Sequence, residues 1–199
     1  VIWNKILNIT LEFLIKSIFL KKKCNEIIKA LDPKKNKLHT FYKPLADSQF
    51  KTGGDPDSCY LKDNKAGDDI AKHIKDVYYK IIYKYITDLN NEGIDWFNKW
   101  NGYSFPKFIK YKKGTKMINH CDHIHDLFVE GKIPRGVPIL SIITILNNDY
   151  EGGEIIFCKK FSYKLKAGET VLFPSNFLYP HEIKSITKGH RYSMVSWVY

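Results

Sequence analysis

The sequence predicts an α+β fold in which N-terminal helices support an array of short strands, arranged as a β-sandwich or jelly roll. Three observations predict it. An apolar stripe at helical spacing occupies residues 70–89, short β-rich runs fill the chain after residue 105, and turn-forming residues separate those runs. A parallel α/β sheet would alternate its strands with helices, so this order excludes one.

The N-terminal part is predicted to be helical. Residues 2–31 carry apolar side chains at helical spacing, and Lys21-Lys22-Lys23 divides the pattern into two segments. Asp32-Pro33 ends the second segment, because the residue before a proline is driven out of the α region. Residues 33–67 are rich in turn formers, so we expect a long connection with short strands near 40–42 and 59–61.

The clearest helix follows this connection. It is expected to begin at Asp68 or Asp69 and to reach Leu89, where Asn90-Asn91-Glu92-Gly93 stops it. Its apolar residues recur at spacings of three and four, so the helix needs a broad apolar surface beneath it. We expect that surface to be a sheet.

The second half of the chain is predicted to hold eight strands. The sequence Glu151-Gly152-Gly153-Glu154 is interpreted as a hairpin turn between two of them. An aromatic cluster before the strands, with Trp96, Phe97, Trp100 and Tyr103, is expected to close one end of the barrel. We therefore divide one domain into helical support over residues 1–104 and a strand-rich core over 105–199. The predicted strands are 105–111, 115–121, 137–146, 154–158, 161–165, 169–173, 179–185 and 190–198.

Composition limits the class of protein and its surroundings. The chain has 199 residues, 44% of them hydrophobic, which excludes a disordered or collagenous chain. No apolar run approaches the roughly 18–20 residues of a membrane helix, so no membrane partner is expected. The four cysteines are scattered, which favours a reducing, cytoplasmic location. Because the chain begins at Val1, a secretory origin with a removed signal peptide stays open.

The net charge of +11 allows two interpretations. Nearly all the basic residues are lysines, with only Arg135 and Arg191 as arginines, and this favours a lysine-rich drift of composition. Nucleic-acid surfaces are normally richer in arginine, which contacts phosphates and bases bidentately. A nucleic-acid partner remains an alternative to a peptide or protein substrate, and the oligomeric state is not predicted.

A cluster of metal-ligating side chains lies at residues 120–126. On an extended segment His120 and Asp122 share one face, and His181 can join them from a later strand. Two histidines and a carboxylate form a facial triad that suits Fe(II), because three coordination positions stay open. Arg191 follows His181 by ten residues, and its guanidinium fork matches an organic carboxylate beside the metal. His123, His125 and Asp126 are expected to turn away from the metal.

These residues occur within a longer ordered pattern. The chain resembles the iron and 2-oxoglutarate-dependent dioxygenases, and within them the prolyl 4-hydroxylase-like branch, over about residues 105–197. The matching elements, in order, are Tyr111-x-x-Gly114, His120-x-Asp122, Leu146-Asn147, Gly152-Gly153-Glu154, Gly168, Leu172-Phe173-Pro174-Ser175, His181, Gly189-x-Arg191-Tyr192-Ser193 and Trp197.

The resemblance implies a double-stranded β-helix, the cupin-like jelly roll. It implies that His120, Asp122 and His181 bind Fe(II) and that Arg191 binds the distal carboxylate of 2-oxoglutarate. Tyr111 is then expected to hydrogen-bond the cosubstrate, and Ser141, with Thr144 as its rival, to supply a hydroxyl near the same carboxylate. The implied cofactors are Fe(II), 2-oxoglutarate and O2, with ascorbate as a further expectation.

The implied reaction is hydroxylation of an unactivated C–H bond, with release of succinate and CO2, and peptidyl proline is the favoured substrate. Collagen-type prolyl hydroxylases usually have lysine where this chain has Arg191, which disfavours a collagen-like substrate. Lysyl residues and nucleic acid are alternative substrates for the same chemistry. Two further alternatives are a zinc hydrolase using His120, His123 and His125, and a metal-free binding module.

Overall fold

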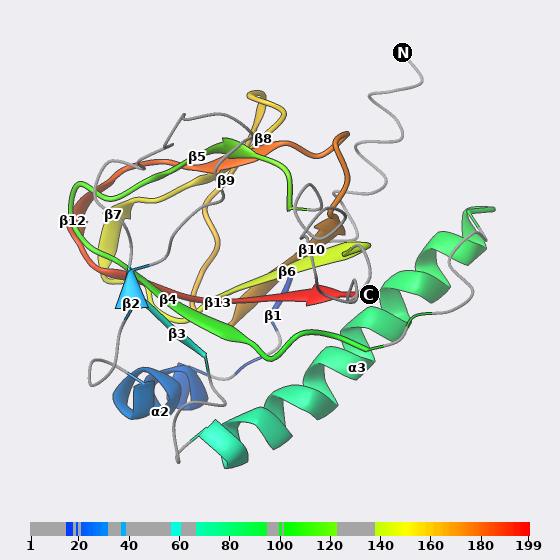
Figure 1. Cartoon of the computed structure of the whole chain (residues 1–199), viewed down its shortest axis with the longest axis horizontal. Helices are drawn as coiled ribbons and strands as arrows, with labels where there is room; N and C mark the ends of the chain where they lie inside the picture. The colour runs from blue at the N-terminus through cyan, green and yellow to red at the C-terminus, as the bar shows by residue number, and fades with distance from the viewer. Residues whose placement is uncertain are drawn as a thin grey trace, which may run out of the picture.

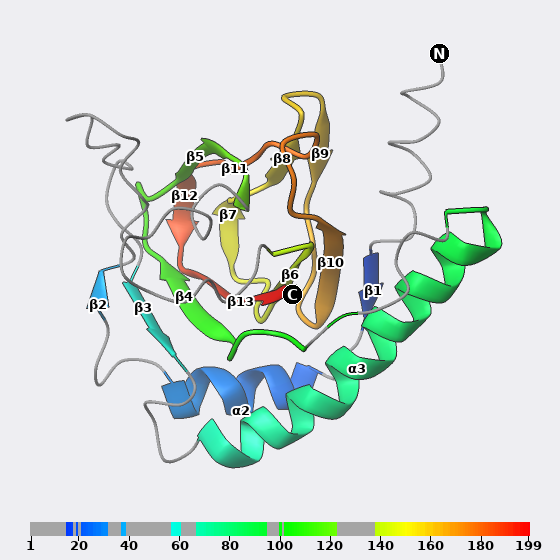
Figure 2. The ribbon, with the colours of Figure 1, turned by 45° about the vertical axis from the view of Figure 1, so that its right-hand side comes forward.

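A computed structural model describes residues 15–17, 19, 21–31, 37–38, 57–60, 67–94, 100, 102–122 and 138–199. In these ranges two antiparallel sheets face each other, and two helices lie against the outer face of the larger sheet (Figures 1 and 2). The helices are α2 (Lys21–Leu31) and α3 (Gly67–Asn91). No helix among the described residues is both long and apolar enough to span a bilayer.

The larger sheet has seven strands in the order β1-β10-β6-β13-β4-β3-β2. The smaller sheet has the order β5-β11-β8-β9, and β12 and β7 form a separate pair. The strands are β1 (Ile15–Ser17), β2 (Lys37–Leu38), β3 (Asp57–Tyr60), β4 (Lys107–Tyr111), β5 (Met117–His120), β6 (Leu140–Ile145), β7 (Tyr150–Gly152), β8 (Ile155–Phe157), β9 (Phe161–Tyr163), β10 (Glu169–Pro174), β11 (His181–Ile183), β12 (Ile186–Gly189) and β13 (Arg191–Val198).

The predicted α+β jelly roll is confirmed, and each of the eight predicted runs contains a strand. Strands β7 and β12 were not predicted. They pair with each other through Ile186–Gly152 and Gly189–Tyr150, at the side of the barrel where the two sheets approach. Both are short and lie in turn-rich sequence, so neither has the alternation of a half-buried strand.

Helix α3 lies on a sheet, as its apolar stripe predicts. Ile74, Tyr78 and Ile82 are fully buried along one face. The Tyr78 hydroxyl lies 3.2 Å from Thr144 Oγ1 on β6, and that hydroxyl lies 2.7 Å from Thr170 Oγ1 on β10. This hydrogen-bonded chain satisfies three polar groups in the core and fixes the helix on the two strands.

Three details of the N-terminal half differ from the prediction. Ile15–Ser17 is a strand that pairs with Val171–Glu169, so residues before Lys21 are not all helical. Strand β2 extends the same sheet and was not predicted, whereas β3, which pairs with β4, overlaps the strand expected near 59–61. The lysine run opens α2 instead of breaking it, because long side chains with exposed ammonium groups are good helix formers. The strand predicted near 40–42 lies outside the described residues.

The predicted hairpin at Glu151-Gly152-Gly153-Glu154 is wrong. Strand β7 pairs with β12, and β8 pairs with β11 and β9, so the two strands flanking the glycines do not pair with each other. The glycines instead carry the chain from one sheet to another, with φ of +77° and +71°. Trp100 and Tyr103 contact Tyr79 on α3, so these two members of the aromatic cluster pack against the helix. Trp96 and Phe97 lie outside the described residues.

Candidate active site

A cavity lies between the two sheets and is partly open to solvent. Its floor comes from β13, where alternate residues Arg191, Ser193, Val195 and Trp197 face inward. Its roof comes from β5 and β11, where His120 pairs with His181 and Met117 pairs with Ile183. Residues far apart in sequence are therefore brought together by strand register.

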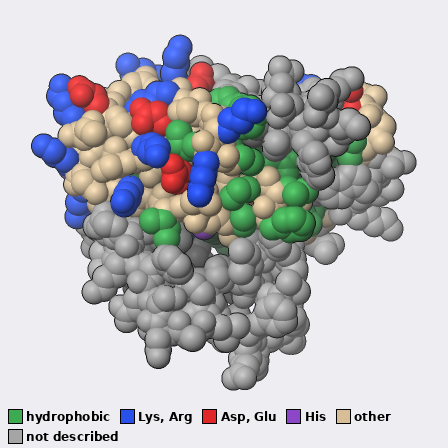
Figure 3. Space-filling model, turned by 90° about the horizontal axis from the view of Figure 1, so that it is seen from above, with side chains coloured by type: hydrophobic (Ala, Val, Ile, Leu, Met, Phe, Trp, Pro, Cys, Tyr) green, Lys and Arg blue, Asp and Glu red, His purple; other side chains and the backbone are tan. Residues whose placement is uncertain are grey.

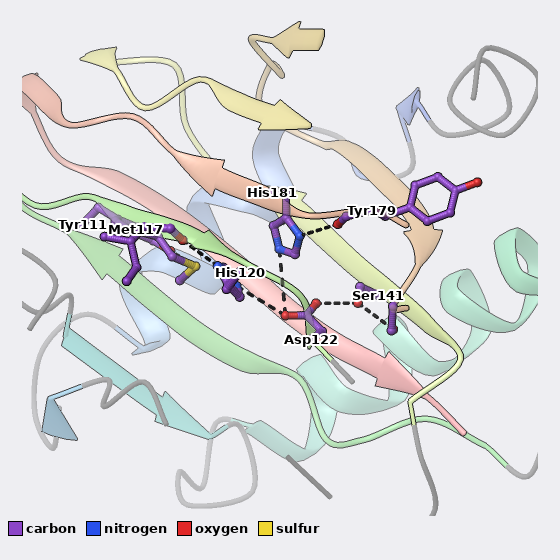
Figure 4. A network of polar contacts seen from close by, with 9 residues as sticks. Tyr111, Met117, His120, Asp122, Ser141, Tyr179 and His181 are labelled. Carbon is purple, nitrogen blue, oxygen red and sulfur yellow. Dashed lines mark hydrogen bonds and ion pairs between the residues drawn. The ribbon is translucent and has the colours of Figure 1, made fainter. Parts of the chain in front are cut away.

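Three potential metal ligands converge at one end of this cavity. One ligand atom from each of His120, Asp122 and His181 lies within 4.8 Å of the others. Asp122 Oδ1 is 3.4 Å from His120 Nε2 and 3.9 Å from His181 Nε2 (Figure 4). His181 is 2% exposed and Asp122 is 9% exposed, so the group is shielded but reachable from the His120 side. The structure thus assembles the three residues that the sequence singled out.

Backbone carbonyls set the tautomers of both histidines. His120 Nδ1 lies 2.7 Å from the carbonyl of Ile118, and His181 Nδ1 lies 3.2 Å from that of Tyr179. A carbonyl only accepts, so each Nδ1 donates, and in the neutral imidazole each Nε2 then has its lone pair available for a metal. Phe173 and Phe157 pack against the His181 ring, with centroids 4.8 and 5.7 Å away, and hold its orientation. This is the arrangement that a metal-binding imidazole requires.

The electrostatics of Asp122 and His181 suit metal binding. Burial opposes ionisation of Asp122, but His181, His120 and the Ser141 hydroxyl outweigh it and hold the pKa of this carboxyl well below its usual range. Burial lowers the pKa of His181 to about 4, so its imidazole is neutral near pH 7. Burial opposes protonation of His120, but Asp122 and the Ile118 carbonyl outweigh it and raise the pKa of His120, so a cation must displace a proton there. A charged carboxylate and neutral Nε2 atoms are the protonation states that coordinate a cation.

Arg191 lies at the opposite end of the cavity. Its side chain is 1% exposed, and its guanidinium carbon lies 4.9 Å from the centre of the Tyr111 ring, which pairs with it across β4 and β13. Nη1 donates a long hydrogen bond of 3.4 Å to Ser193 Oγ. Nε and Nη2 are buried and have no acceptor among the described residues. A buried charge with unpaired donors is costly, so this end of the cavity is built for an anion.

Tyr111 lines the cavity beside Arg191, and its hydroxyl contacts Met117 Sδ at 3.9 Å. Burial raises the pKa of Tyr111 to about 12, although Arg191 acts in the opposite direction, so the phenol is protonated and can donate. The structure does not bring Ser141 or Thr144 to Arg191. Ser141 pairs with Trp197, six residues along β13 from Arg191, and Thr144 points toward α3.

Sequence reasoning missed several contributors. Ser175 hydrogen-bonds Ser141 at 2.8 Å, and its only sequence signal was its place after Leu172-Phe173-Pro174. Gly153 makes room for Arg191, because a Cβ there would lie 2.9 Å from Arg191 Cδ and 2.6 Å from Ile186 Cδ1. His123, His125 and Asp126 lie outside the described residues.

Charged side chains of both signs lie on the face that carries the smaller sheet and the β7–β12 pair. Figure 3 shows lysines on this face with acidic side chains among them. Lys184 lies 2.7 Å from Glu182, Lys188 lies 2.9 Å from Glu151, and Lys164 lies 3.7 Å from Glu154. The positive charge is thus partly paired on this face.

Comparisons with known proteins agree with this geometry. Residues 106–199 match the family model of the 2OG-Fe(II) oxygenase superfamily. A PKHD-type hydroxylase of Psychrobacter sp. is 37% identical over 98 residues, which are 47% of this chain and 37% of that protein. A PKHD-type hydroxylase of Acinetobacter baumannii is 43% identical over 98 residues, 47% of this chain and 42% of that protein. The chain therefore spans less than half the length of these curated relatives.

Solved structures share the fold at low sequence identity. A prolyl hydroxylase from Trichoplax adhaerens, in complex with a hypoxia-inducible-factor peptide fragment, superposes with a TM-score of 0.64 and 14% identity, covering 99% of this chain and 90% of that chain. The viral collagen prolyl hydroxylase of Paramecium bursaria Chlorella virus-1 gives 0.60 and 14%, covering 93% and 94%. These likenesses establish the double-stranded β-helix.

Proposed function

We propose that this chain, whose residues 106–199 match the family model of the 2OG-Fe(II) oxygenase superfamily, is an Fe(II)- and 2-oxoglutarate-dependent hydroxylase that acts on a peptidyl proline. The observation that carries the proposal is the buried Arg191 guanidinium, whose Nε and Nη2 have no acceptor among the described residues. It lies in the same cavity as His120, Asp122 and His181. A cavity with an anion-binding arginine at one end and three metal ligands at the other suits a ligand that binds the arginine and the metal at once.

The cavity between these two ends fits the middle of a dicarboxylate. Ile109, Ile143, Ile183 and Val195 line it together with Met117. These side chains have no polar atoms except a thioether, so they suit the methylene groups of 2-oxoglutarate and exclude water. Arg191 and the Tyr111 hydroxyl then hold the distal carboxylate, while His120, Asp122 and His181 hold Fe(II).

Bound Fe(II) and 2-oxoglutarate supply the oxidising chemistry, in which O2 provides one oxygen atom to a C–H bond and one to succinate as CO2 leaves. The chain's own residues would bind and orient the metal and 2-oxoglutarate. The Nε2 atoms of both histidines and Asp122 Oδ1 would hold the metal, and three protein ligands would leave coordination positions for the cosubstrate and O2. The buried setting keeps water away from the reacting groups.

A peptide substrate is supported by the fold and not by a described contact. The Trichoplax prolyl hydroxylase holds a peptide on the same architecture. Lysyl residues are the alternative target within this chemistry. Nucleic acid remains a prediction from the charge of +11, and the salt dependence discussed below tests it.

The test is a coupled assay of the purified chain with Fe(II), 2-oxoglutarate and O2. Succinate is measured together with the mass of proline-containing peptides, with and without ascorbate. We expect succinate formation and a gain of one oxygen in a subset of peptides. Absence of succinate in the presence of all cosubstrates, from protein that binds Fe(II), would reject the proposed function. Lysine-containing peptides in the same panel distinguish the alternative.

A further inference from the structure

The two carboxylate oxygens of Asp122 have different surroundings. Oδ1 faces the histidines, at 3.4 Å from His120 Nε2 and 3.9 Å from His181 Nε2. Oδ2 lies 2.5 Å from the Ser141 hydroxyl on β6 (Figure 4). The two oxygens therefore have different partners.

The hydrogen bonds behind Ser141 run in one direction. A carboxylate that binds a metal has no hydrogen, so Ser141 must donate its single hydroxyl hydrogen to Oδ2. The distance of 2.5 Å suits a hydroxyl donating to a charged oxygen. Ser141 can then only accept from Ser175, whose hydroxyl lies 2.8 Å away. The direction of donation, from Ser175 to Ser141 and from Ser141 to Asp122, therefore follows from the number of hydroxyl hydrogens available.

The two serines are rigidly placed. Both are buried, with exposures of 0% for Ser141 and 1% for Ser175. Ser141 lies in the middle of the larger sheet, where β6 is paired with β10 through Phe173 and with β13 through Trp197. Asp122 lies at the end of the smaller sheet, just after β5. The Ser141–Asp122 hydrogen bond therefore ties the metal carboxylate to the opposite sheet.

We propose that Ser141, supported by Ser175, is a positioning residue. Its hydrogen bond keeps Asp122 Oδ2 from binding the metal, so that Asp122 coordinates a metal through Oδ1 alone. This inference rests on the metal site of the proposed function. A carboxylate that binds through both oxygens would occupy one more coordination position. Ser141 thus preserves the positions that a cosubstrate and O2 both need.

The test counts water molecules on a bound metal, a readout that loss of stability does not produce. Mn(II) is loaded without O2 or cosubstrate, and the relaxation of water protons reports the number of waters on the ion. We expect Ser141→Ala to retain Mn(II) but to lose about one third of the inner-sphere relaxivity, because a second carboxylate oxygen replaces one of three waters. Ser141→Thr should restore the wild-type value.

Thr144→Val is the matched control. It removes a buried hydroxyl from the same strand, but one that bonds Tyr78 and Thr170 on the side facing α3. Its relaxivity should equal that of the wild type. If Ser141→Ala does not fold, Ser141→Cys provides a weaker donor of similar size, and Ser175→Ala removes the supporting hydrogen bond. Each should lower the relaxivity in the same direction.

The outcomes separate this inference from the proposed function. If the wild type binds Mn(II) and the Ser141 and Ser175 variants keep its relaxivity, the positioning role is refuted and the metal site stands. If the wild type binds no Mn(II), the metal site of the proposed function fails and this inference fails with it. Lower relaxivity in both the Ser141 variants and Thr144→Val would also refute it, since the effect would then be general to the core.

Discussion

Arg191→Ala is the substitution that tests the anion end of the cavity most directly. In the structure the guanidinium is buried, bonded to Ser193 at 3.4 Å, and has two further nitrogens without an acceptor among the residues described. A distal carboxylate would pair with those nitrogens. Removing one partner from a buried ion pair costs about 3–5 kcal/mol, because the other charge is left unpaired. At about 1.4 kcal/mol per tenfold, the Kd for 2-oxoglutarate should rise roughly a hundredfold to several thousandfold.

The ligand-free protein should respond differently. Arg191→Ala removes a buried charge that is only partly hydrogen-bonded, which offsets part of the packing lost against Tyr111. We therefore expect a small change in the Tm of the free protein. The wild type should gain Tm with rising 2-oxoglutarate, because a ligand that binds only the folded state stabilises it, whereas the variant should gain almost none over the same range.

The assay is a titration with 2-oxoglutarate in the presence of Mn(II) and without O2, followed by Tm and by calorimetry. Metal affinity should be unchanged, because His120, Asp122 and His181 are untouched. Arg191→Lys should be intermediate, since the charge stays but the two-pronged geometry is lost. His190→Ala, an exposed neighbour on the chain, is the control and should behave as wild type. An unaltered Kd in Arg191→Ala would mean that the carboxylate is held elsewhere, and the site would have to be reassigned.

Four further predictions concern the metal, the pocket wall, a half-buried lysine and the substrate. His181→Ala should weaken Mn(II) binding at least about 100-fold by calorimetry, and a smaller loss than tenfold would argue against ligation. Gly153→Ala forces an unfavourable φ and a contact with Arg191 Cδ, so the Kd for 2-oxoglutarate should rise about tenfold while Mn(II) affinity stays constant; an equal loss of both would point to general unfolding. Burial lowers the pKa of Lys107 from 10.5 to about 8. Between these two pH values Lys107 is protonated in the unfolded chain but not in the folded one, so the free energy of unfolding should rise with pH across that window. Lys107→Met should flatten this rise in denaturant titrations and add about 1–2 kcal/mol at pH 7, with exposed Lys113→Met as control; an unchanged pH profile would contradict the assignment. A peptide substrate should lose activity only modestly with salt, whereas nucleic-acid ligands should show a steep linear fall of log affinity against log salt, and a shallow slope for several such ligands would remove that alternative.

The parts of the fold that the sequence predicted are those that bury one face. Helix α3 and the strands of the core carry apolar residues at the spacing of their own geometry, and burial enforces that spacing. Strands β7 and β12 escaped prediction because three- and four-residue edge segments have too few residues to show alternation. Strand β1 was mistaken for helix because Ile15 and its neighbours fit both periods, and pairing with β10 decides between them.

The site was predicted unevenly for a similar reason. His120, Asp122, His181 and Arg191 were predicted because their residue types are chemically unusual and their order matched a family pattern. Ser141 was predicted to lie near Arg191, yet register places it opposite Trp197, at the other end of β13. Its hydroxyl bonds Asp122 instead. The face on which a residue lies follows from alternation, but its position along a cavity depends on the pairing of strands, which one sequence does not contain.

The same register leads us to expect that cosubstrate binding and metal binding can be altered separately. Arg191 belongs to the larger sheet, and both histidines belong to the smaller one. Contacts between the sheets occur at both ends of the cavity, through Tyr111 and Met117 near the arginine and through Ser141 and Asp122 near the metal set. These two contacts between the sheets therefore fix the distance between the Arg191 guanidinium and the metal ligands. A ligand that spans both ends must match that distance, so we expect the two sheets to select the length of a dicarboxylate as well as its charge.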